Sequence, residues 1–505
     1  WRIRATTSLP RFSRQNLAAV PTLAVVASLR PGCPLGAGWK KPLELLPYDL
    51  AAARDTFHAR SSEIYLGDPD LDGLLKELDG WPIAVTVLAR RTGEYPRAKD
   101  LAEAWRTHHS ALLVSGSSRR DADLGACVGL SLAHPRMNDA AKRLLGLLAL
   151  SPDGIDQDDM NKLLPGEGNP AAATLRAVGG LTTDEYYRLK DRDRPRMWMP
   201  APLRDYIGTR FPASNDDQNR WVRLYCRRCR RMGNQIGDKG SAGVVQRFRA
   251  ELGNTQEAIR LGLTGVVLAE ACMGAAGLGQ LGYITSVDVR PILRQAAAAA
   301  LRLRDRGLAA DCLLNLGRIA LTRSDMSELQ VAAERALTLS RQSKWISGEA
   351  QSTCLLADLA DCRSDHTIAR ALIGQAATMY RIRDVQGEAN CAYMMSRIAI
   401  HRREYTDGLR RAQEAQVVYR RIGELLGEAN CLAIYGSVAL GRYEYAEATQ
   451  HLRAAISLYQ EVGNTGGPAD CFRGLGDIYL GENKLAEAED QYMLAREICE
   501  QIDLA

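Results

Sequence analysis

Small and apolar residues recur in a fixed order along the C-terminal part of the chain, with a period of about 40 residues. Each copy begins with Gly-Glu-Ala, or with Gly-Pro-Ala in the last one, at Gly348, Gly387, Gly427 and Gly467. A period of this length predicts a solenoid of stacked helical repeats. We count five units over residues 301–505, and an irregular helical bundle is the alternative.

Within each copy, a small residue follows a larger one in the first expected helix, as in Leu316-Gly317 and Tyr435-Gly436. In the second helix, alanines seven residues apart, such as Ala448 and Ala455, share one face. Small residues at such positions let neighbouring helices approach closely. The sequence therefore predicts that packing between helices involves Gly317, Ala320, Ala357, Ala360, Ala399, Gly436, Ala439, Ala448, Ala455, Gly476, Ala488 and Ala495.

The turns Gly441-Arg442-Tyr443 and Gly481-Glu482-Asn483 divide two of the copies into two helices each. With the pattern of small residues, these helix pairs resemble the tetratricopeptide repeat, in a variant about six residues longer than the common form. The resemblance implies a superhelix that binds a protein or peptide on its concave face. Self-oligomerisation is a second interaction that we expect of it.

The composition is that of an ordinary soluble protein, with 46% hydrophobic and 25% charged residues. A net charge of +5 on 505 residues offers no general argument for nucleic-acid binding. The 12 cysteines show no paired spacing, so we expect free thiols in a reducing compartment and a cytoplasmic location. Cys226 and Cys229 have metal-ligand spacing, but no second Cys/His pair lies nearby, so no zinc site is expected.

Two segments have some features of targeting or membrane signals. Residues 1–43 contain no acidic residue and include the apolar run Leu17–Leu29, as a transit peptide does. Pro21 interrupts that run, so a buried strand is the preferred interpretation. Leu261–Gly282 is also apolar, but Glu270 and internal glycines favour a buried helix pair over a membrane span.

The N-terminal region predicts a strand followed by helices. Residues 21–30 form a short apolar run that ends in the cation Arg30. After a loop rich in proline and glycine, Leu50–Phe57 and Leu71–Leu78 predict two helices. The pattern Gly80-Trp81-Pro82 then begins a third helix.

This order resembles the nucleotide-binding modules of STAND-type signalling ATPases, the NB-ARC and NACHT-like switches. The resemblance implies that Arg30 senses the terminal phosphate of ATP, and that Pro82, in a motif with Gly80, lies against the adenine of ADP or ATP. From the residues alone, Arg30 is a cation at a strand end, and Pro82 is a proline in the first turn of a helix.

Residues 121–213 predict helices followed by short strands, which is the order of a winged helix. The helix candidates are Leu124–Ala133, Asp139–Ala149, Gln157–Leu164 and Ala171–Val178, the strand candidates are Leu181 and Met197–Pro200, and Lys190–Arg196 forms a charged tip between them. A winged helix also suggests DNA binding. The candidate recognition helix holds one arginine, Arg176, and the tip mixes Asp with Arg, so a packing module is the better interpretation.

In STAND proteins, a histidine near the end of the winged helix touches the diphosphate. Here Pro200 stands at the corresponding place in the stretch Met199–Tyr206. Proline has no N–H to donate to a phosphate, so direct nucleotide contact from this domain is not expected.

The segment Arg220–Arg231 is the most basic run of the chain. It has the composition of a nuclear signal or a phosphate-binding patch. The interspersed Trp221, Val222, Leu224 and Tyr225 favour a helix with one buried face and one solvated basic face.

The residues needed for ATP hydrolysis are missing from the sequence. A phosphate-binding loop of the form GxxxxGK[ST] requires the dipeptide Gly-Lys, which occurs nowhere in the chain. Neither a catalytic triad nor a paired carboxylate arrangement stands out either. We therefore expect no enzyme activity and no metal, and ADP or ATP as a cofactor only if a further N-terminal segment is present.

These features divide the chain into five expected domains, mainly α-helical in fold class. They are the end of an α/β nucleotide-binding domain (1–54), a helical subdomain (55–118), a winged helix (119–213), a helical connector (214–300) and the tetratricopeptide repeats (301–505).

The expected function is that of a signal-transduction switch. A ligand bound by the repeats would bias an ADP- or ATP-binding module. A repeat scaffold with no nucleotide role is the first alternative, and a winged-helix transcription regulator with a repeat sensor is the second. Neither membrane association nor, on balance, nucleic-acid binding is expected.

Overall fold

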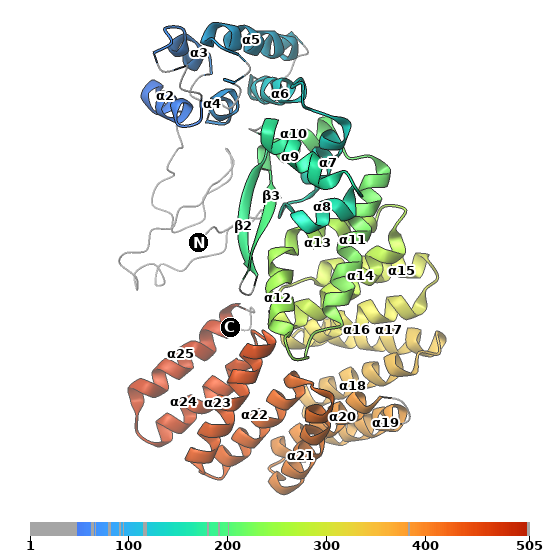
Figure 1. Ribbon diagram of the computed structural model, residues 1–505. Coiled ribbons are helices and arrows are strands. Elements are labelled where there is room, and N and C mark those ends of the chain that lie inside the picture. The colour runs from blue at the N-terminus through green and yellow to red at the C-terminus, as the bar shows by residue number, and fades with distance from the viewer. Residues whose placement is uncertain are drawn as a thin grey trace. The chain divides into compact units, whose positions relative to one another are not determined.

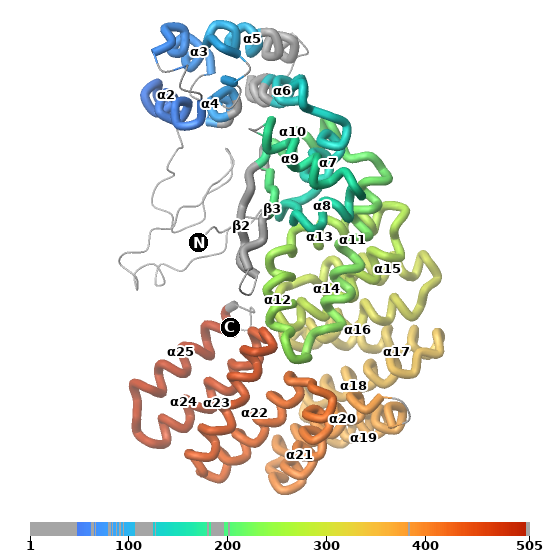
Figure 2. The backbone as a smooth tube through the Cα atoms, viewed as in Figure 1, coloured from blue at the N-terminus to red at the C-terminus, as the bar shows by residue number. Residues whose placement is uncertain are grey.

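The computed structural model describes residues 48–501, apart from 62–64, 66, 79–81, 90–91, 94, 115–118, 179–180, 190–191, 200 and 382–383. The chain divides into two compact units, residues 1–106 and 107–505. The strand expected at residues 21–30 and most of the expected nucleotide-binding remnant, residues 1–54, lie outside the described residues. Figure 1 shows the helices and strands, and Figure 2 shows the path of the backbone.

The described residues of the first unit are helical. Its elements are α2 (Leu50–His58), α3 (Leu71–Glu77), α4 (Pro82–Ala89) and the beginning of α5 (Ala98–Val114). The side chains of Phe57, Tyr65 and Trp105 are buried at its centre. At its edge, the guanidinium of Arg54 donates to both carboxylate oxygens of Asp72. The three helices that the sequence predicts between residues 50 and 90 are confirmed.

The second unit begins with helices around a small sheet. These elements are α6 (Arg119–Leu132), α7 (Asp139–Leu150), β1 (Ile155–Asp156), α8 (Gln157–Leu163), α9 (Gly168–Val178), β2 (Thr183–Leu189), β3 (Arg192–Trp198) and α10 (Ala201–Arg210). The three strands lie in the order β1-β3-β2 and pair in antiparallel fashion, with Ile155 opposite Met197 and Thr183 opposite Trp198. We call residues 139–210 the sheet module.

The order of helices and strands in the sheet module is the order that the sequence assigned to a winged helix, but the strand limits were wrong. The expected tip at 190–196 and the strand at 197–200 are replaced by β3, which runs from Arg192 to Trp198. Alternating hydrophobicity was a poor guide here because β3 reads Arg-Asp-Arg-Pro-Arg before its two apolar residues. One charged residue of the expected tip, Arg196, is buried at 7% exposure.

A helical segment follows, and after it the repeats. The segment comprises α11 (Asn215–Gly233), α12 (Ser241–Ala250), α13 (Leu252–Gly262), α14 (Leu268–Thr285) and α15 (Arg290–Arg302). The apolar stretch 261–282 is divided between α13 and α14, as the sequence predicted. In the described residues of the chain, no helix combines the length and apolar character that spanning a membrane requires.

The repeat region is a solenoid of five helix pairs over residues 306–501 (Figure 1), which confirms the predicted helical-repeat fold. The two helices of each pair pack on each other and on the next pair. The pairs are α16 (Arg306–Thr322) with α17 (Met326–Gln342), α18 (Ile346–Cys362) with α19 (His366–Tyr380), α20 (Val385–His401) with α21 (Tyr405–Ile422), α22 (Leu425–Gly441) with α23 (Tyr445–Val462), and α24 (Pro468–Gly481) with α25 (Leu485–Gln501).

Each turn between the helices of a pair contains one residue in the left-handed region. These residues are Ser324, Ser364, Arg403, Tyr443 and Asn483, with φ between 55° and 64°. Two of these turns lie where the sequence predicted them, at 441–443 and 481–483, and the left-handed residue in each is the third, Tyr443 or Asn483, while Gly441 and Gly481 end the preceding helices. A Cβ atom at Gly441 would lie 2.8 Å from the phenol oxygen of Tyr405, so close packing and not turn geometry requires glycine there.

The fourth helix pair of the solenoid and the turn after it contact the helical segment that precedes the repeats. The amide of Leu425 donates to the carbonyl of Gly237 in the loop before α12. The hydroxyl of Ser241 donates to the carbonyl of Val462, and the amide of Thr465 donates to that of Ile284 at the end of α14. Residues about 180 to 220 positions apart in the sequence therefore meet, which closes one turn of the superhelix.

Candidate functional site

The first helix of each pair lines the inner side of the superhelix. Successive first helices, α16, α18, α20, α22 and α24, pack on one another, whereas successive second helices in the described residues have no comparable contact. In a curved stack, the helices that lie closer together are on the inside of the curve. We call the solvent-facing side of α14 and these five helices the inner face.

One register position on the inner face carries polar side chains from repeat to repeat. It directly follows the small residue of the packing motif, and the same motif occurs in α14 as Leu281-Gly282. We call this set the inner ladder, and it consists of Tyr283, Arg318, Asp358, Arg397, Ser437 and Asp477.

Opposite charges at neighbouring positions of the inner ladder pair with each other. The guanidinium of Arg397 in α20 donates to the carboxylate of Asp358 in α18 and lies 3.3 Å from that of Asp361. Arg318 in α16 donates to Oε1 of Gln351 in α18 over 2.9 Å. Side chains of three successive repeats are thus joined by contacts that run across the inner face.

The environment of Asp358 and Tyr283 in the inner ladder favours the uncharged forms of these two weak acids. Burial raises the pKa of the Asp358 carboxyl, although the Arg397 guanidinium opposes the shift. Burial also raises the pKa of the Tyr283 phenol, on which Arg318, Asp358, Arg397 and Glu424 act electrostatically. These groups come from four different helices or helix caps, so the electrostatic environment of Tyr283 combines side chains of successive repeats. Tyr283 remains 38% exposed.

A second cluster lies beside the inner ladder, around the nearly buried Asp361. Nδ1 of His366 is 3.1 Å from one carboxylate oxygen, and Nδ1 of His401 is 3.4 Å from the other. Burial acts to raise the pKa of Asp361, but the contacts with His401, Arg397 and His366 outweigh it and the pKa is lowered. The carboxylate is therefore held in its ionised form.

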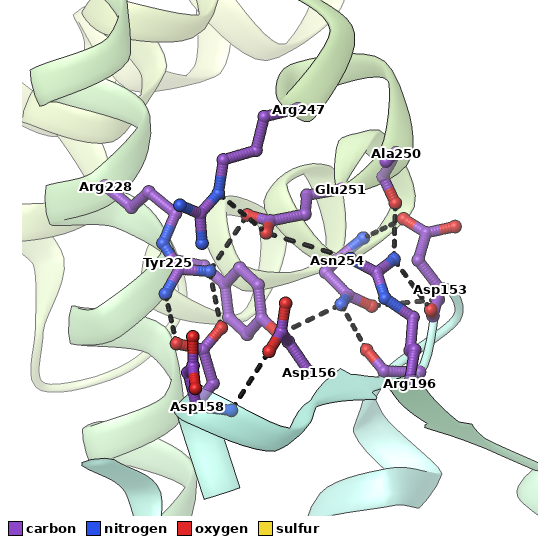
Figure 3. A network of polar contacts seen from close by, with 12 residues as sticks. Asp153, Asp156, Asp158, Arg196, Tyr225, Arg228, Arg247, Ala250, Glu251 and Asn254 are labelled. Atoms are coloured by element: carbon purple, nitrogen blue, oxygen red, sulfur yellow. Dashed lines mark hydrogen bonds and ion pairs between the residues drawn. The ribbon is translucent and has the colours of Figure 1, made fainter. Parts of the chain in front are cut away.

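A buried polar network joins the sheet module to the helices that lead into the repeats (Figure 3). Arg228 of α11 contacts the carboxylates of Asp159 at 2.5 Å and Glu251 at 2.9 Å, and both carboxylates are 1% exposed. Arg247 and Arg196 also lie against Glu251, at 3.2 and 3.7 Å. We call this network the joint.

Amide and backbone groups complete the joint. The side chain of Asn254 donates to the carbonyl of Gly154 and to the phenol of Tyr225, and its backbone amide donates to the carboxylate of Asp153. Arg196 of β3 donates to the carbonyls of Asp153 and Ala250. A buried network in which so many donors have acceptors fixes the orientation of the elements that it joins.

The joint corrects the interpretation of the basic run at 220–231. The apolar side of α11 is buried as predicted, with Trp221, Val222 and Tyr225 among its residues. The arginines, however, do not form one solvated face, because Arg228 is 10% exposed and ion-paired. Arg230 pairs with Asp311 of the first repeat over 2.8 Å. The sequence could not show this, because the acidic partners of Arg228 and Arg230 lie 23, 69 and 81 residues away.

The small residues expected to pack between helices lie at helix contacts. All are buried except Ala495, which is half-buried on α25. At Gly436 and Gly476 the neighbour is a side chain of the second helix, Leu452 and Tyr492, each 2.6 Å from the place that a Cβ would take. Ala448 and Ala455 share a buried cluster with Cys471 of the next repeat.

The residues implied by the STAND resemblance are mostly outside the described residues. This applies to Arg30, Gly80 and Pro200. Pro82 is the first residue of α4, and its carbonyl accepts a hydrogen bond from the Thr86 hydroxyl. Proline offers no donor to a phosphate.

No cluster of three or more His, Cys, Asp or Glu side chains with the arrangement of a metal site occurs among the described residues. Cys226 and Cys229, the pair with metal-ligand spacing, are both buried in α11, and burial raises the pKa of both thiols.

Neither a family model nor a curated protein matches the sequence. Solved structures share some of the helical arrangement. A Rap protein complexed with competence and sporulation factor is 11% identical, with 60% of this chain and 81% of that chain covered and a TM-score of 0.46. BtubC (BKLC) from P. vanneervenii is 15% identical, with 42% and 91% covered and a TM-score of 0.33.

A STAND protein with a tetratricopeptide repeat sensor from Pyrococcus horikoshii is 12% identical, with 90% of this chain and 66% of that chain covered and a TM-score of 0.39. Identities and TM-scores at this level carry no conclusion about function. The described structure itself defines the class: a helical-repeat protein with a polar inner face, joined to a small module of helices and an antiparallel sheet.

Proposed function

We propose that the repeat superhelix binds a protein or peptide ligand on its inner face. The observation that supports this most directly is the inner ladder, a register position that carries charged and aromatic side chains on successive helices and pairs Asp358 with Arg397 across two repeats. Tyr283 is a partly exposed residue of this ladder, and tyrosine is enriched among residues that dominate binding energy. A repeat protein commonly offers such an extended concave surface to its partner.

The ligand that suits this face is a peptide segment with both acidic and basic groups. Arg318 and Arg397 supply donors for carboxylates, while Asp358 and Asp361 supply acceptors for basic groups. The charges of this set cancel, so a strongly charged ligand of either sign would gain little. Selectivity would follow from the order of charges along the ligand.

We further propose that the superhelix signals to the sheet module, as in a signal-transduction switch. The joint supports this role, because its ion pairs link α8, α11 and α12 directly. A ligand that changes the curvature of the repeats would act on the joint through α11, which contacts the first repeat at the Arg230–Asp311 pair. The order of elements in the sheet module supports its assignment as a winged helix.

The STAND-like nucleotide role is a separate element of the proposal. It rests on the resemblance at Arg30, Gly80 and Pro82, and no step of the binding mechanism above requires a nucleotide. Equilibrium binding of fluorescent ATP and ADP to the full chain tests it, and Arg30→Ala should weaken the binding of ATP but not that of ADP, because only ATP carries the terminal phosphate. Absence of binding would favour the alternative of a repeat scaffold without a nucleotide role.

Self-association has a candidate surface at the last helix pair. Leu480, Leu485 and Met493 are 52%, 63% and 48% exposed there and line one shallow hollow. Light scattering of the full chain and of a Leu485→Glu variant would detect an oligomer that depends on this surface.

A peptide library of random 12-residue sequences displayed on phage tests ligand binding on the inner face. We expect selection on the full chain to enrich peptides that bind in isolation. These peptides should lose at least tenfold in affinity for the Tyr283→Ala and Arg318→Ala variants. A Val417→Ala variant, altered at a 68% exposed side chain on a second helix, is the control. If no peptide is enriched, or if the enriched peptides bind all variants equally, the proposal is wrong.

A further inference from the structure

Two cysteines of successive repeats lie in contact beside the inner ladder. Sγ of Cys354 in α18 and Sγ of Cys391 in α20 are 4.0 Å apart. Cys391 is 2% exposed, whereas Cys354 is half-buried. The repeat pattern does not predict this pair, because Cys391 shares its register with Cys431 and Cys471, but Cys354 stands two positions later in its own repeat.

The half-buried Cys354 lies on the side of α18 that carries a residue of the inner ladder. Cys354 and Asp358 are four residues apart on α18 and therefore share one side of that helix. Asp358 and Arg318, both of the inner ladder, act electrostatically on the Cys354 thiol. The partial exposure of Cys354 gives a small oxidant access to it, whereas Cys391 is 2% exposed in the apolar cluster that includes Tyr380.

We propose that Cys354 and Cys391 are a modification site, at which a hydroperoxide converts the two thiols into a disulfide between repeats. This assignment goes beyond the proposed ligand binding and does not depend on it. The two sulfur atoms must approach from 4.0 Å to about 2.05 Å, a movement that rotation of the two side chains can share.

The reaction balances in two steps. The Cys354 thiolate attacks the hydroperoxide, which breaks the O–O bond and yields a sulfenic acid and, after uptake of a proton, an alcohol. The Cys391 sulfur then displaces the sulfenic oxygen as water and forms the S–S bond. Overall, two thiols and one hydroperoxide yield one disulfide, one alcohol and one water, and the sulfurs lose the two electrons that the peroxide gains.

The bond would act on the inner face. Cys354 and Asp358 belong to α18, and Cys391 and Arg397 belong to α20, so a disulfide ties together the two helices that carry the central ion pair. It would also close a loop of 37 residues and restrict the relative movement of two repeats. The oxidised chain should therefore bind inner-face ligands with a different affinity from the reduced chain.

The environment of Cys354 sets the conditions of the reaction. Contact with Cys391 and burial raise the pKa of the Cys354 thiol well above its usual value. Only the thiolate reacts, so the rate should rise about tenfold between pH 7.5 and pH 8.5.

The test is oxidation of the full-length chain by hydrogen peroxide at both pH values, followed by denaturation, thiol titration and mass spectrometry of non-reduced peptides. We expect the number of titratable thiols to fall by two from the 12 of the reduced chain. Mass spectrometry should find a disulfide-linked pair of peptides that contains Cys354 and Cys391. Reduction with dithiothreitol should restore both.

Two cysteine variants provide the controls, so that the test does not depend on one variant folding correctly. Cys354→Ala should abolish the linked peptide, whereas Cys431→Ala should leave it unchanged. Cys431 lies at the position of Cys391 in the next repeat and is equally buried. The proposal is wrong if the wild-type chain yields no such linked peptide, if Cys354 or Cys391 forms a disulfide mainly with another cysteine, or if the rate does not rise with pH.

Discussion

The phenol of Tyr419 donates a hydrogen bond to Oδ1 of Asn390 over 2.6 Å. Asn390 belongs to the first helix of the same pair, and the ring of Tyr419 packs on Gly427 of the next pair. One side chain thus connects three helices of two repeats. The same arrangement recurs at Tyr459, which donates to Asn430 over 2.7 Å and packs on Gly467.

This contact explains why the triplets at Gly387, Gly427 and Gly467 begin with glycine, while at Gly348 the ring that requires glycine is that of Trp345. A Cβ on Gly427 would lie 2.5 Å from the Tyr419 ring. We expect Gly427→Ala to lower the free energy of unfolding by about 1–3 kcal/mol, because the ring or the helix must shift. Urea unfolding followed by circular dichroism measures the change.

Gly374→Ala is the matched control for that substitution. Gly374 also lies inside a repeat helix, but a Cβ there meets open space. The Gly374→Ala substitution should raise the free energy of unfolding by about 0.5–1 kcal/mol, because alanine is a better helix former than glycine. Equal effects of the two substitutions would contradict the role assigned to the ring.

The repeats could be predicted from the sequence because their packing is local and periodic. Glycine, alanine and cysteine at fixed spacing identify the helix pairs. The sequence predicted five pairs in the same register. The bridging tyrosines were not predicted, although Tyr380, Tyr419 and Tyr459 stand at a spacing of about 40 residues. The signal was present, but no local rule links a tyrosine to a glycine eight residues later across a turn.

The inner ladder and the joint could not be predicted for a different reason. A register position occupied by Tyr, Arg, Asp, Arg, Ser and Asp has no common chemistry, so a search for similar residues passes over it. The joint unites residues separated by up to about 100 positions, and its geometry depends on how α11 and α13 lie against the sheet module. Only the folded chain brings such groups together.

The joint should be intolerant of losing one charge. Arg228→Met would leave Asp159 and Glu251, each 1% exposed, without their shared cation. Removal of one member of a buried ion pair is strongly destabilising, and we expect a loss of about 3 kcal/mol. Thermal unfolding of the full chain measures it, and Arg228→Met/Asp159→Asn should recover some of the loss.

An arginine in an exposed pair provides the comparison for the joint. Arg260 pairs with Glu257 three residues before it, and its side chain is 62% exposed. Arg260→Met should cost less than about 1 kcal/mol. If Arg228→Met costs no more than Arg260→Met, the joint does not orient the sheet module.

The central ion pair of the inner ladder should show pH-dependent coupling. Arg397→Met leaves the Asp358 carboxylate buried without its cation, which we expect to cost about 2 kcal/mol at pH 8. Burial already raises the pKa of Asp358, and the substitution should raise it further, so protonation relieves the penalty as the pH falls toward 5. Urea unfolding at both pH values measures the difference.

The double variant Arg397→Met/Asp358→Asn tests whether the two residues act as a pair. Because the uncompensated charge is then absent, most of the stability at pH 8 should return. A penalty that is the same at pH 5 and pH 8, or a double variant no better than Arg397→Met, would argue against the pairing.

Glu424 should make the closed superhelix less stable as the pH rises. Its carboxylate accepts the amide of Gly427 at the beginning of α22, beside the contact of Leu425 with Gly237. Burial raises the pKa of Glu424 to about 7, and the backbone hydrogen bond from Gly427 opposes the shift only incompletely. Below the ordinary pKa of 4.5, the folded and the unfolded chain both hold the proton, so the group has no effect on stability.

Between pH 4.5 and pH 7 the unfolded chain releases the proton while the folded chain retains it, so the free energy of unfolding falls as the pH rises. The loss reaches about 3 kcal/mol above pH 7. Glu424→Gln removes the titration but keeps an acceptor for Gly427, so the variant should match the wild type near pH 4.5 and exceed it in stability at pH 8. Urea unfolding of wild type and Glu424→Gln across this pH range measures the effect. Glu444→Gln, altered at an exposed glutamate, is the control. Parallel stability profiles for wild type and Glu424→Gln would show that the buried carboxyl does not titrate as described.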